Sequence, residues 1–127
     1  MVKVPSDLLY SKSHEWVRIE GDTATVGITD YAQSELGDIV LVDLPEAGRV
    51  VGLDESFATI ESVKSVSDIY APLAGEITAT NETLGTQSEL VNADPYGSGW
   101  LVKIRLADPS QAGSLLTPDA YTAVLES

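Results

Sequence analysis

The chain has 127 residues, enough for one domain whose hydrophobic core needs neither disulfides nor metals. Hydrophobic residues make up 43% and charged residues 21% of the sequence, which excludes an intrinsically disordered chain. The formal net charge of -13 argues against nucleic acid and anionic membranes as partners. The acidity itself fits two interpretations, solubility in a crowded cytoplasm or steering toward basic docking surfaces.

The sequence contains no cysteine and one histidine. Any sulfur redox chemistry must therefore come from an added group, and neither a nucleophile paired with a base nor a metal cluster is predicted. No stretch approaches the ~20 apolar residues of a membrane span, and the first ten residues do not resemble a signal peptide. We expect residues 1–127 to form a single cytoplasmic domain.

The beginning of the chain predicts β structure with one short helix. Residues 16–20 and 23–28 form a predicted hairpin around Gly21-Asp22. Thr29 is a suitable N-cap and Gly37 a suitable stop for a helix over residues 30–36. A hairpin followed by a brief helix is expected.

Short strands continue toward the C-terminus, where a second helix is predicted. The further predicted strands are residues 39–44, 55–62, 66–70, 75–80 and 100–106, separated by prolines and glycines. Thr117-Pro118-Asp119 supplies an N-cap, a proline for the first helical position and an acid in the first turn. We therefore expect a sandwich or barrel with a C-terminal helix over about residues 117–126.

Lys64 lies between two predicted strands, in a hairpin of about residues 55–71, and is expected to project from its tip. An amine at a hairpin tip can enter the active site of a modifying enzyme while the scaffold stays rigid, as a swinging-arm carrier requires. The competing interpretation is a lysine that only keeps a turn soluble. The residues around Lys64 decide between the two.

Four segments resemble those of glycine cleavage H proteins, in the same order and over almost the whole chain. Around the lysine they are Glu61-Ser62-Val63-Lys64, Val66-Ser67-Asp68 and Ala71-Pro72. The opening segment is Ser11-Lys12-Ser13-His14-Glu15-Trp16-Val17. The other two are Val26-Gly27-Ile28-Thr29-Asp30-Tyr31-Ala32 with Leu36-Gly37-Asp38, and Leu90-Val91-Asn92 with Asp94-Pro95-Tyr96-Gly97 and Gly99-Trp100-Leu101. Ser65 departs from the alanine that H proteins commonly have after the modified lysine.

The resemblance implies a mainly β fold, the barrel-sandwich hybrid of lipoyl and biotinyl carriers, with short helical additions and a C-terminal helix. It implies lipoate as the cofactor, joined to Lys64 through an amide that removes the lysine charge. The implied location is the bacterial cytoplasm.

The resemblance also implies a non-catalytic carrier of the glycine cleavage system. The carrier would take the aminomethyl group of glycine from the P protein, a pyridoxal-phosphate glycine decarboxylase, to the T protein, an aminomethyltransferase. The L protein, a dihydrolipoyl dehydrogenase, would reoxidise the arm. An enzyme that attaches lipoate is a further implied partner.

Carried over residue by residue, the resemblance assigns Ser13, Glu15 and Asp68 to a cleft for the loaded arm. It assigns Glu61 and Gly75 to recognition by the lipoate-attaching enzyme. It implies no catalytic residue and no metal. The competing interpretations are solvated acids and a glycine needed for turn geometry. A lone histidine near an aromatic residue is more often structural, so the histidine in the opening segment receives no catalytic role.

Other carriers and an unmodified binding module are the alternatives to this prediction. An H-like relay protein that donates lipoyl groups to other enzymes would have nearly the same sequence, and an unmodified binding module stays open. Lipoyl domains of 2-oxoacid dehydrogenases and biotin carriers typically have Asp-Lys-Ala or Met-Lys-Met at the tip. They also lack a segment like Ser13-His14-Glu15-Trp16, so the residues argue against both.

Overall fold

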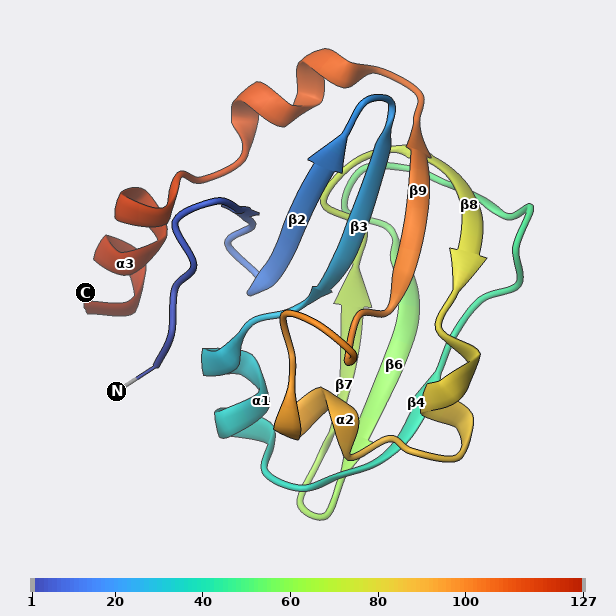
Figure 1. The fold of residues 1–127 in the computed structure, drawn as a ribbon, viewed down its shortest axis with the longest axis vertical. Helices are drawn as coiled ribbons and strands as arrows, with labels where there is room; N and C mark the ends of the chain where they lie inside the picture. The colour runs from blue at the N-terminus through green and yellow to red at the C-terminus, as the bar shows by residue number, and fades with distance from the viewer. Residues whose placement is uncertain (1, 127) are drawn as a thin grey trace.

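The computed structural model describes residues 2–126 and shows two antiparallel sheets with short helices around them (Figure 1). The six-stranded sheet has the order β1-β2-β3-β9-β8-β5, and the three-stranded sheet has the order β4-β6-β7. The strands are β1 (Leu9–Tyr10), β2 (Glu15–Glu20), β3 (Thr23–Ile28), β4 (Ile39–Asp43), β5 (Val50–Val51), β6 (Ser56–Ser62), β7 (Val66–Tyr70), β8 (Gly75–Thr80) and β9 (Val102–Leu106). The helices are α1 (Asp30–Leu36), α2 (Leu90–Ala93) and α3 (Pro118–Glu126), with the 3-10 turns η1 (Glu82–Gly85) and η2 (Pro109–Ser114).

The main hydrophobic core is built from the inward faces of the strands of both sheets. In β9, Val102, Ile104 and Leu106 are buried and the residues between them are exposed, the period-2 pattern of a strand with one covered face. The smaller sheet contributes Ile60 and Ile69 to the same cluster. Burial of these aliphatic side chains holds the two sheets together.

A second buried cluster fixes both ends of the chain to the six-stranded sheet. The rings of Tyr10 and Tyr121 stack with their centroids 4.6 Å apart, which attaches α3 to β1. Trp16 lies opposite Gly27 in the β2–β3 register and donates a hydrogen bond from Nε1 to the Pro95 carbonyl at 2.8 Å. A Cβ atom on Gly27 would lie 2.6 Å from Trp16 Nε1, so the indole ring needs glycine there.

The two predicted helices and their caps are confirmed. The Ala32 backbone N–H donates to Thr29 Oγ1 at 3.2 Å, and Gly37 follows α1 with a φ of 80°. In α3 the Ala120 backbone N–H donates to Thr117 Oγ1 at 3.2 Å. Local capping chemistry, which is readable from sequence, determines these boundaries.

The structure adds elements that the sequence pattern did not predict: β1, β5, α2, η1 and η2. The two-residue strands exist only because distant backbones pair with them, as Val50 and Val51 pair with Glu76 and Gly75. The last strand begins at Val102 instead of the predicted residue 100, and the Trp100 carbonyl before it accepts a hydrogen bond from Asn81 Nδ2 at 2.8 Å. Among residues 2–126, none of the helices combines the length and apolar character that a membrane crossing needs.

Gly75 lies inside the six-stranded sheet, where it opens β8 and pairs with Leu106 of β9. A Cβ atom there would overlap the Arg105 carbonyl oxygen and lie 2.6 Å from Ile104 Cγ2. The glycine is therefore required by a close backbone approach in the sheet, and not by the turn geometry considered from the sequence.

We predict that Gly75→Ala lowers the free energy of unfolding by about 1–3 kcal/mol, because the added methyl group overpacks the sheet. Urea denaturation followed by circular dichroism measures the change. Gly113→Ala is the matched control, since a Cβ atom at Gly113 meets nothing within 4 Å. Equal denaturation midpoints for the two variants would contradict the close approach.

Candidate functional site

The turn between β6 and β7 is closed by the side chain of Ser62, which is only 6% exposed. Its Oγ atom accepts hydrogen bonds from the backbone N–H groups of Lys64 at 3.3 Å and Ser65 at 3.1 Å. The Ser62 N–H donates to the Ser65 carbonyl at 2.8 Å. A serine hydroxyl that pairs with backbone groups stabilises a tight turn, and here it holds the exposed Lys64 at the tip. Because Ser65 takes part through its backbone, the alanine usual in H proteins would make the same bonds.

The Lys64 side chain lies over the glycine that ends α1. A Cβ atom on Gly37 would be 3.3 Å from Lys64 Cε and 3.9 Å from Nζ. The tip is tied to the same segment, because the Val63 N–H donates to the Asp38 carbonyl at 3.0 Å. The turn between α1 and β4 therefore forms the floor under Lys64.

Asn92 of α2 holds that turn from below, a role that sequence reasoning missed. Its Nδ2 group donates to the Gly37 carbonyl and to Gln33 Oε1, both at 2.9 Å, and its Oδ1 atom accepts from the Ile39 N–H at 2.9 Å. The available signal was the position of Asn92 in one of the H-protein-like segments. Its bonds join residues more than fifty positions apart, so spacing alone could not reveal them.

A cleft of about 190 Å³ lies between α1 and β7. It begins next to the floor of the lysine, since Glu35 and Leu36 line it and directly precede Gly37. Its other lining residues are Ser13, His14, Ile28, Tyr31, Ala32, Ser67, Asp68 and Ile69. The structure thus brings two of the predicted arm-cleft residues, Ser13 and Asp68, to one cleft.

Glu15, the third of these residues, is 1% exposed and lies beneath the serines of the opening segment. Its Oε1 atom accepts hydrogen bonds from the hydroxyls of Ser11 and, at 2.6 Å, Ser13, and the Tyr70 N–H donates to Oε2 at 3.4 Å. Burial raises the pKa of Glu15, and the hydrogen bonds from Ser11, Ser13 and Tyr70 oppose that rise. Glu15 therefore reaches the cleft through Ser13.

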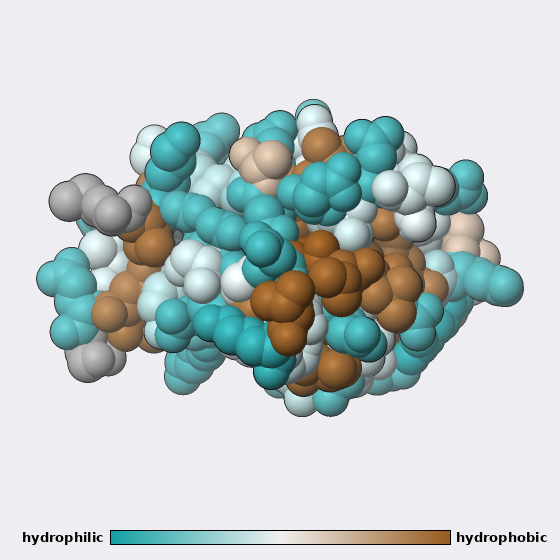
Figure 2. Space-filling model, turned by 90° about the horizontal axis from the view of Figure 1, so that it is seen from below, coloured by the Kyte–Doolittle hydropathy of each residue, from teal (hydrophilic) through white to brown (hydrophobic). Residues whose placement is uncertain are grey.

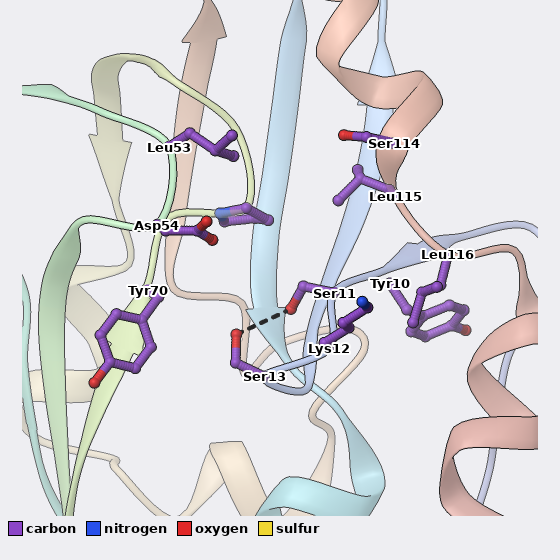
Figure 3. Close-up of a pocket in the computed structure, with 11 residues that line it drawn as sticks. Tyr10, Ser11, Lys12, Ser13, Leu53, Asp54, Tyr70, Ser114, Leu115 and Leu116 are labelled. Atoms are coloured by element: carbon purple, nitrogen blue, oxygen red, sulfur yellow. Dashed lines mark hydrogen bonds between the residues drawn. The ribbon is translucent and has the colours of Figure 1, made fainter.

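Ser13 also borders a second, larger hollow of about 570 Å³ (Figure 3). The close-up shows the hydroxyls of Ser11 and Ser13 facing each other, 3.4 Å apart, beside Lys12, with Asp54 and Tyr70 across the hollow. The two hollows share Ser13.

His14 forms part of the cleft wall and adopts a φ of 72°, an uncommon value for a residue with a side chain. Its Nδ1 atom and the Tyr121 hydroxyl are hydrogen-bonded at 2.8 Å, and its ring centroid is 4.7 Å from that of Tyr31. Burial lowers the pKa of His14, and the charge of Glu35 opposes this. These contacts connect α3 to the cleft wall.

The two residues assigned to recognition by the lipoate-attaching enzyme lie in different places. Glu61 is exposed on β6, opposite Val66 in the register of the hairpin that carries Lys64. Gly75 opens β8, which starts at the end of the sandwich opposite to the hairpin tip (Figure 1). The structure brings Glu61, but not Gly75, close to the lysine. Residues 2–126 hold no group of three or more side chains arranged to bind a metal ion.

Residues 8–127 match the family model described as glycine cleavage H-protein. The chain belongs to this family. It is 56% identical over 126 residues to the glycine cleavage system H protein of Rubrobacter xylanophilus, covering 99% of this chain and 98% of that protein. It is likewise 56% identical over 121 residues to the H protein of Bacteroides thetaiotaomicron, covering 95% and 96%. The crystal structure of the H protein from Mycobacterium marinum superimposes with a TM-score of 0.89 at 38% identity, covering 98% of this chain and 100% of that one.

Membership of the H-protein family confirms the resemblance read from the four segments. It also confirms the predicted fold class, a barrel-sandwich hybrid of the lipoyl-carrier type with short helices and a C-terminal helix. H proteins are carriers. The roles of individual residues in this H-protein chain stay predictions.

We predict that Asn92→Asp loosens the floor under Lys64, because a carboxylate cannot donate to the Gly37 carbonyl and this half-buried acceptor would lose its partner. Hydrogen exchange should show faster exchange of the Val63 and Ile39 amides relative to those of β3 and β9.

Asn81→Asp is the matched control, because Asn81 Nδ2 also donates to two carbonyls, those of Ser98 and Trp100, both at 2.8 Å. It should leave the relative exchange at Val63 unchanged. Equal effects of the two variants at Val63 would contradict a specific role for Asn92.

We predict a pH-dependent effect of Glu15→Gln on stability. A carboxyl whose pKa is raised by folding binds its proton more tightly in the folded state. The wild-type free energy of unfolding therefore falls as the pH rises from the ordinary value of 4.5 through the folded pKa, whereas the variant lacks this titration. Urea denaturation at pH 4, 5.5 and 7 should show the variant gaining stability relative to wild type as the pH rises. A constant difference would disprove the raised pKa.

Proposed function

We propose that the chain is the lipoyl-bearing shuttle of the glycine cleavage system and that Lys64 carries the lipoyl group. The observation that supports this most directly is the position of Lys64, exposed on a hydrogen-bonded hairpin tip and lying over Gly37, which directly follows the cleft residue Leu36. Two of the other three lysines, Lys12 and Lys103, have different surroundings. Lys103 lies in β9 with Nζ 5.5 Å from the Trp100 ring centroid, and Lys12 borders the larger hollow.

The residues beside Lys64 fit a lipoyl group. Ala32, Leu36 and Ile69 offer apolar wall to a hydrocarbon arm, and Ser13 and Asp68 add polar groups to the same cleft. When attached, lipoate supplies the dithiolane that a chain without cysteine lacks. Acylation of Lys64 Nζ removes the lysine charge from the tip.

We propose that Asp68 and Ser13 bind the ammonium of an aminomethyl cargo in the cleft. A carboxylate and a hydroxyl oxygen both accept hydrogen bonds from an ammonium, and the charge of the carboxylate strengthens the interaction. Glu15 acts as a positioning residue, because its carboxyl group accepts the Ser13 hydroxyl at 2.6 Å and so orients it. The cleft walls on α1 and β7 exclude water from one side of the cargo.

The proposed partners are the P protein, which loads the carrier, the T protein, which removes the one-carbon unit, and the L protein, which restores the oxidised arm. An enzyme that attaches lipoate acts first. We further propose that the chain contributes no catalytic group, that residues 1–127 act as one lipoyl-carrier domain, and that it works in the bacterial cytoplasm. Its membership of the H-protein family supports these proposals.

The test is mass spectrometry of intact protein and peptides after expression with lipoate and a lipoate ligase. We predict that wild type and the matched control Lys103→Arg gain one lipoyl group on the peptide containing Lys64, and that Lys64→Arg gains none. An unmodified wild type, under conditions that lipoylate a control domain, would overturn the proposal in favour of a binding module. A lipoylated chain that fails to support glycine cleavage with P, T and L proteins would indicate a relay protein.

A further inference from the structure

Exposed apolar side chains gather at the hairpin end of the molecule (Figure 2). Seven large apolar side chains are exposed among the described residues, and four of them belong to the hairpin tip and the adjacent strand. These four, which we call the tip patch, are Val40 (51% exposed), Leu41 (53%), Val63 (69%) and Val66 (66%). Single exposed apolar residues are ordinary on a protein surface, but a cluster of them marks an interaction site.

Strand pairing places two residues of the tip patch in one row across the three-stranded sheet. Leu41 of β4 pairs with Glu61 of β6, and Glu61 pairs with Val66 of β7. Residues directly opposite each other on neighbouring strands point to the same face of a sheet. Glu61 therefore stands between two apolar side chains, in a row that ends two residues from Lys64.

A bulge in β4 enlarges the patch. The β4–β6 register shifts between Ile39 and Leu41, and as a result two consecutive residues, Val40 and Leu41, are exposed. Regular pleating would have turned one of them inward. Bulges redirect side chains at functional surfaces, and this bulge places an additional valine outside the core.

Resting on the proposed function, we propose that the tip patch is the docking surface for the enzyme that joins lipoate to Lys64. That enzyme must bring Nζ itself to its active centre, so its surface must cover everything within the reach of one lysine side chain. The P, T and L proteins act at the far end of the completed arm and can work at a distance from the tip. Of these partners, only the lipoate-attaching enzyme has to cover the tip patch.

The chemistry of the partner follows from the residues that surround the patch. The opening through which that enzyme admits the lysine is surrounded by apolar side chains that match the tip patch. A basic side chain beside it faces the carboxylate of Glu61. The exposed carboxylates of Asp38 and Asp68 favour the same basic surroundings.

In the reaction Nζ attacks the carbonyl carbon of a lipoyl group activated as a mixed anhydride with a phosphate. The C–N bond forms, the phosphate-bearing group leaves with the bonding electron pair, and an amine proton passes to solvent.

The experiment measures the kinetics of lipoylation of the full chain by a purified lipoate ligase with ATP and lipoate. Leu41→Thr and Val66→Thr, singly and together, remove apolar surface while leaving residues that favour strands. The double variant should raise KM for the chain by roughly tenfold with kcat within about twofold of wild type. Val50→Thr, at a side chain that is 73% exposed on β5 in the other sheet, is the matched control and should leave KM unchanged.

Each result decides the question. An unchanged KM in the double variant, with its fold verified by circular dichroism, would overturn the proposal, as would a raised KM in Val50→Thr. If the patch instead binds the P protein or a second copy of the chain, the double variant would be lipoylated normally but would show slower glycine decarboxylation or no dimer. Either result would also overturn the proposal. Failure of the proposed function is distinguishable, because wild type would then remain unmodified at Lys64 in the mass spectrum of the same sample.

Discussion

The Ser62 hydroxyl accepts the backbone N–H groups of Lys64 and Ser65, and it does so from a buried position. A three-residue connection between two strands has few internal contacts to hold it, so a side chain that pairs with its backbone determines its shape. The position of Lys64 depends on this closure. The Val63 N–H bond to Asp38 then joins the closed turn to the segment after α1. A carrier needs a stiff attachment point for a mobile arm, and under the proposed function these hydrogen bonds supply that stiffness at Lys64.

The buried carboxyl of Glu15 illustrates a local departure from what stability alone would favour. An acid without a cationic partner is costly to bury, and its raised pKa reports that cost. Three donors compensate in part, and one of them, the Ser13 hydroxyl, also lines the cleft. The arrangement is understandable if a cation periodically occupies the cleft beside Ser13, since a second acid, Asp68, borders the same space. Stability would then be exchanged for cargo binding.

Lys64 stands between two surfaces of different character. The cleft is narrow and partly polar, and it runs between α1 and β7. The tip patch consists of four exposed apolar side chains, and the exposed Glu61 lies between two of them, Leu41 and Val66. A carrier must present its lysine to one enzyme before modification and shelter its arm afterwards. Under the two proposals these tasks fall to separate surfaces, so each surface can be built from the side chains that suit its task.

The sequence by itself determined the elements whose causes are local. Thr29 and Gly37 bound α1 through capping bonds within a few residues, and alternation of apolar side chains defines β9. The four segments that resemble those of H proteins identified the family, because each is a contiguous stretch that can be read directly from the sequence. The tertiary structure alone decided the contacts between distant segments, since these depend on how strands pair and sheets stack. This second group contains the hydrogen bonds of Asn92 to the turn after α1, the close approach at Gly75, the two-residue strands and the burial of Glu15. No periodicity within one stretch of chain encodes which remote backbone will lie against it.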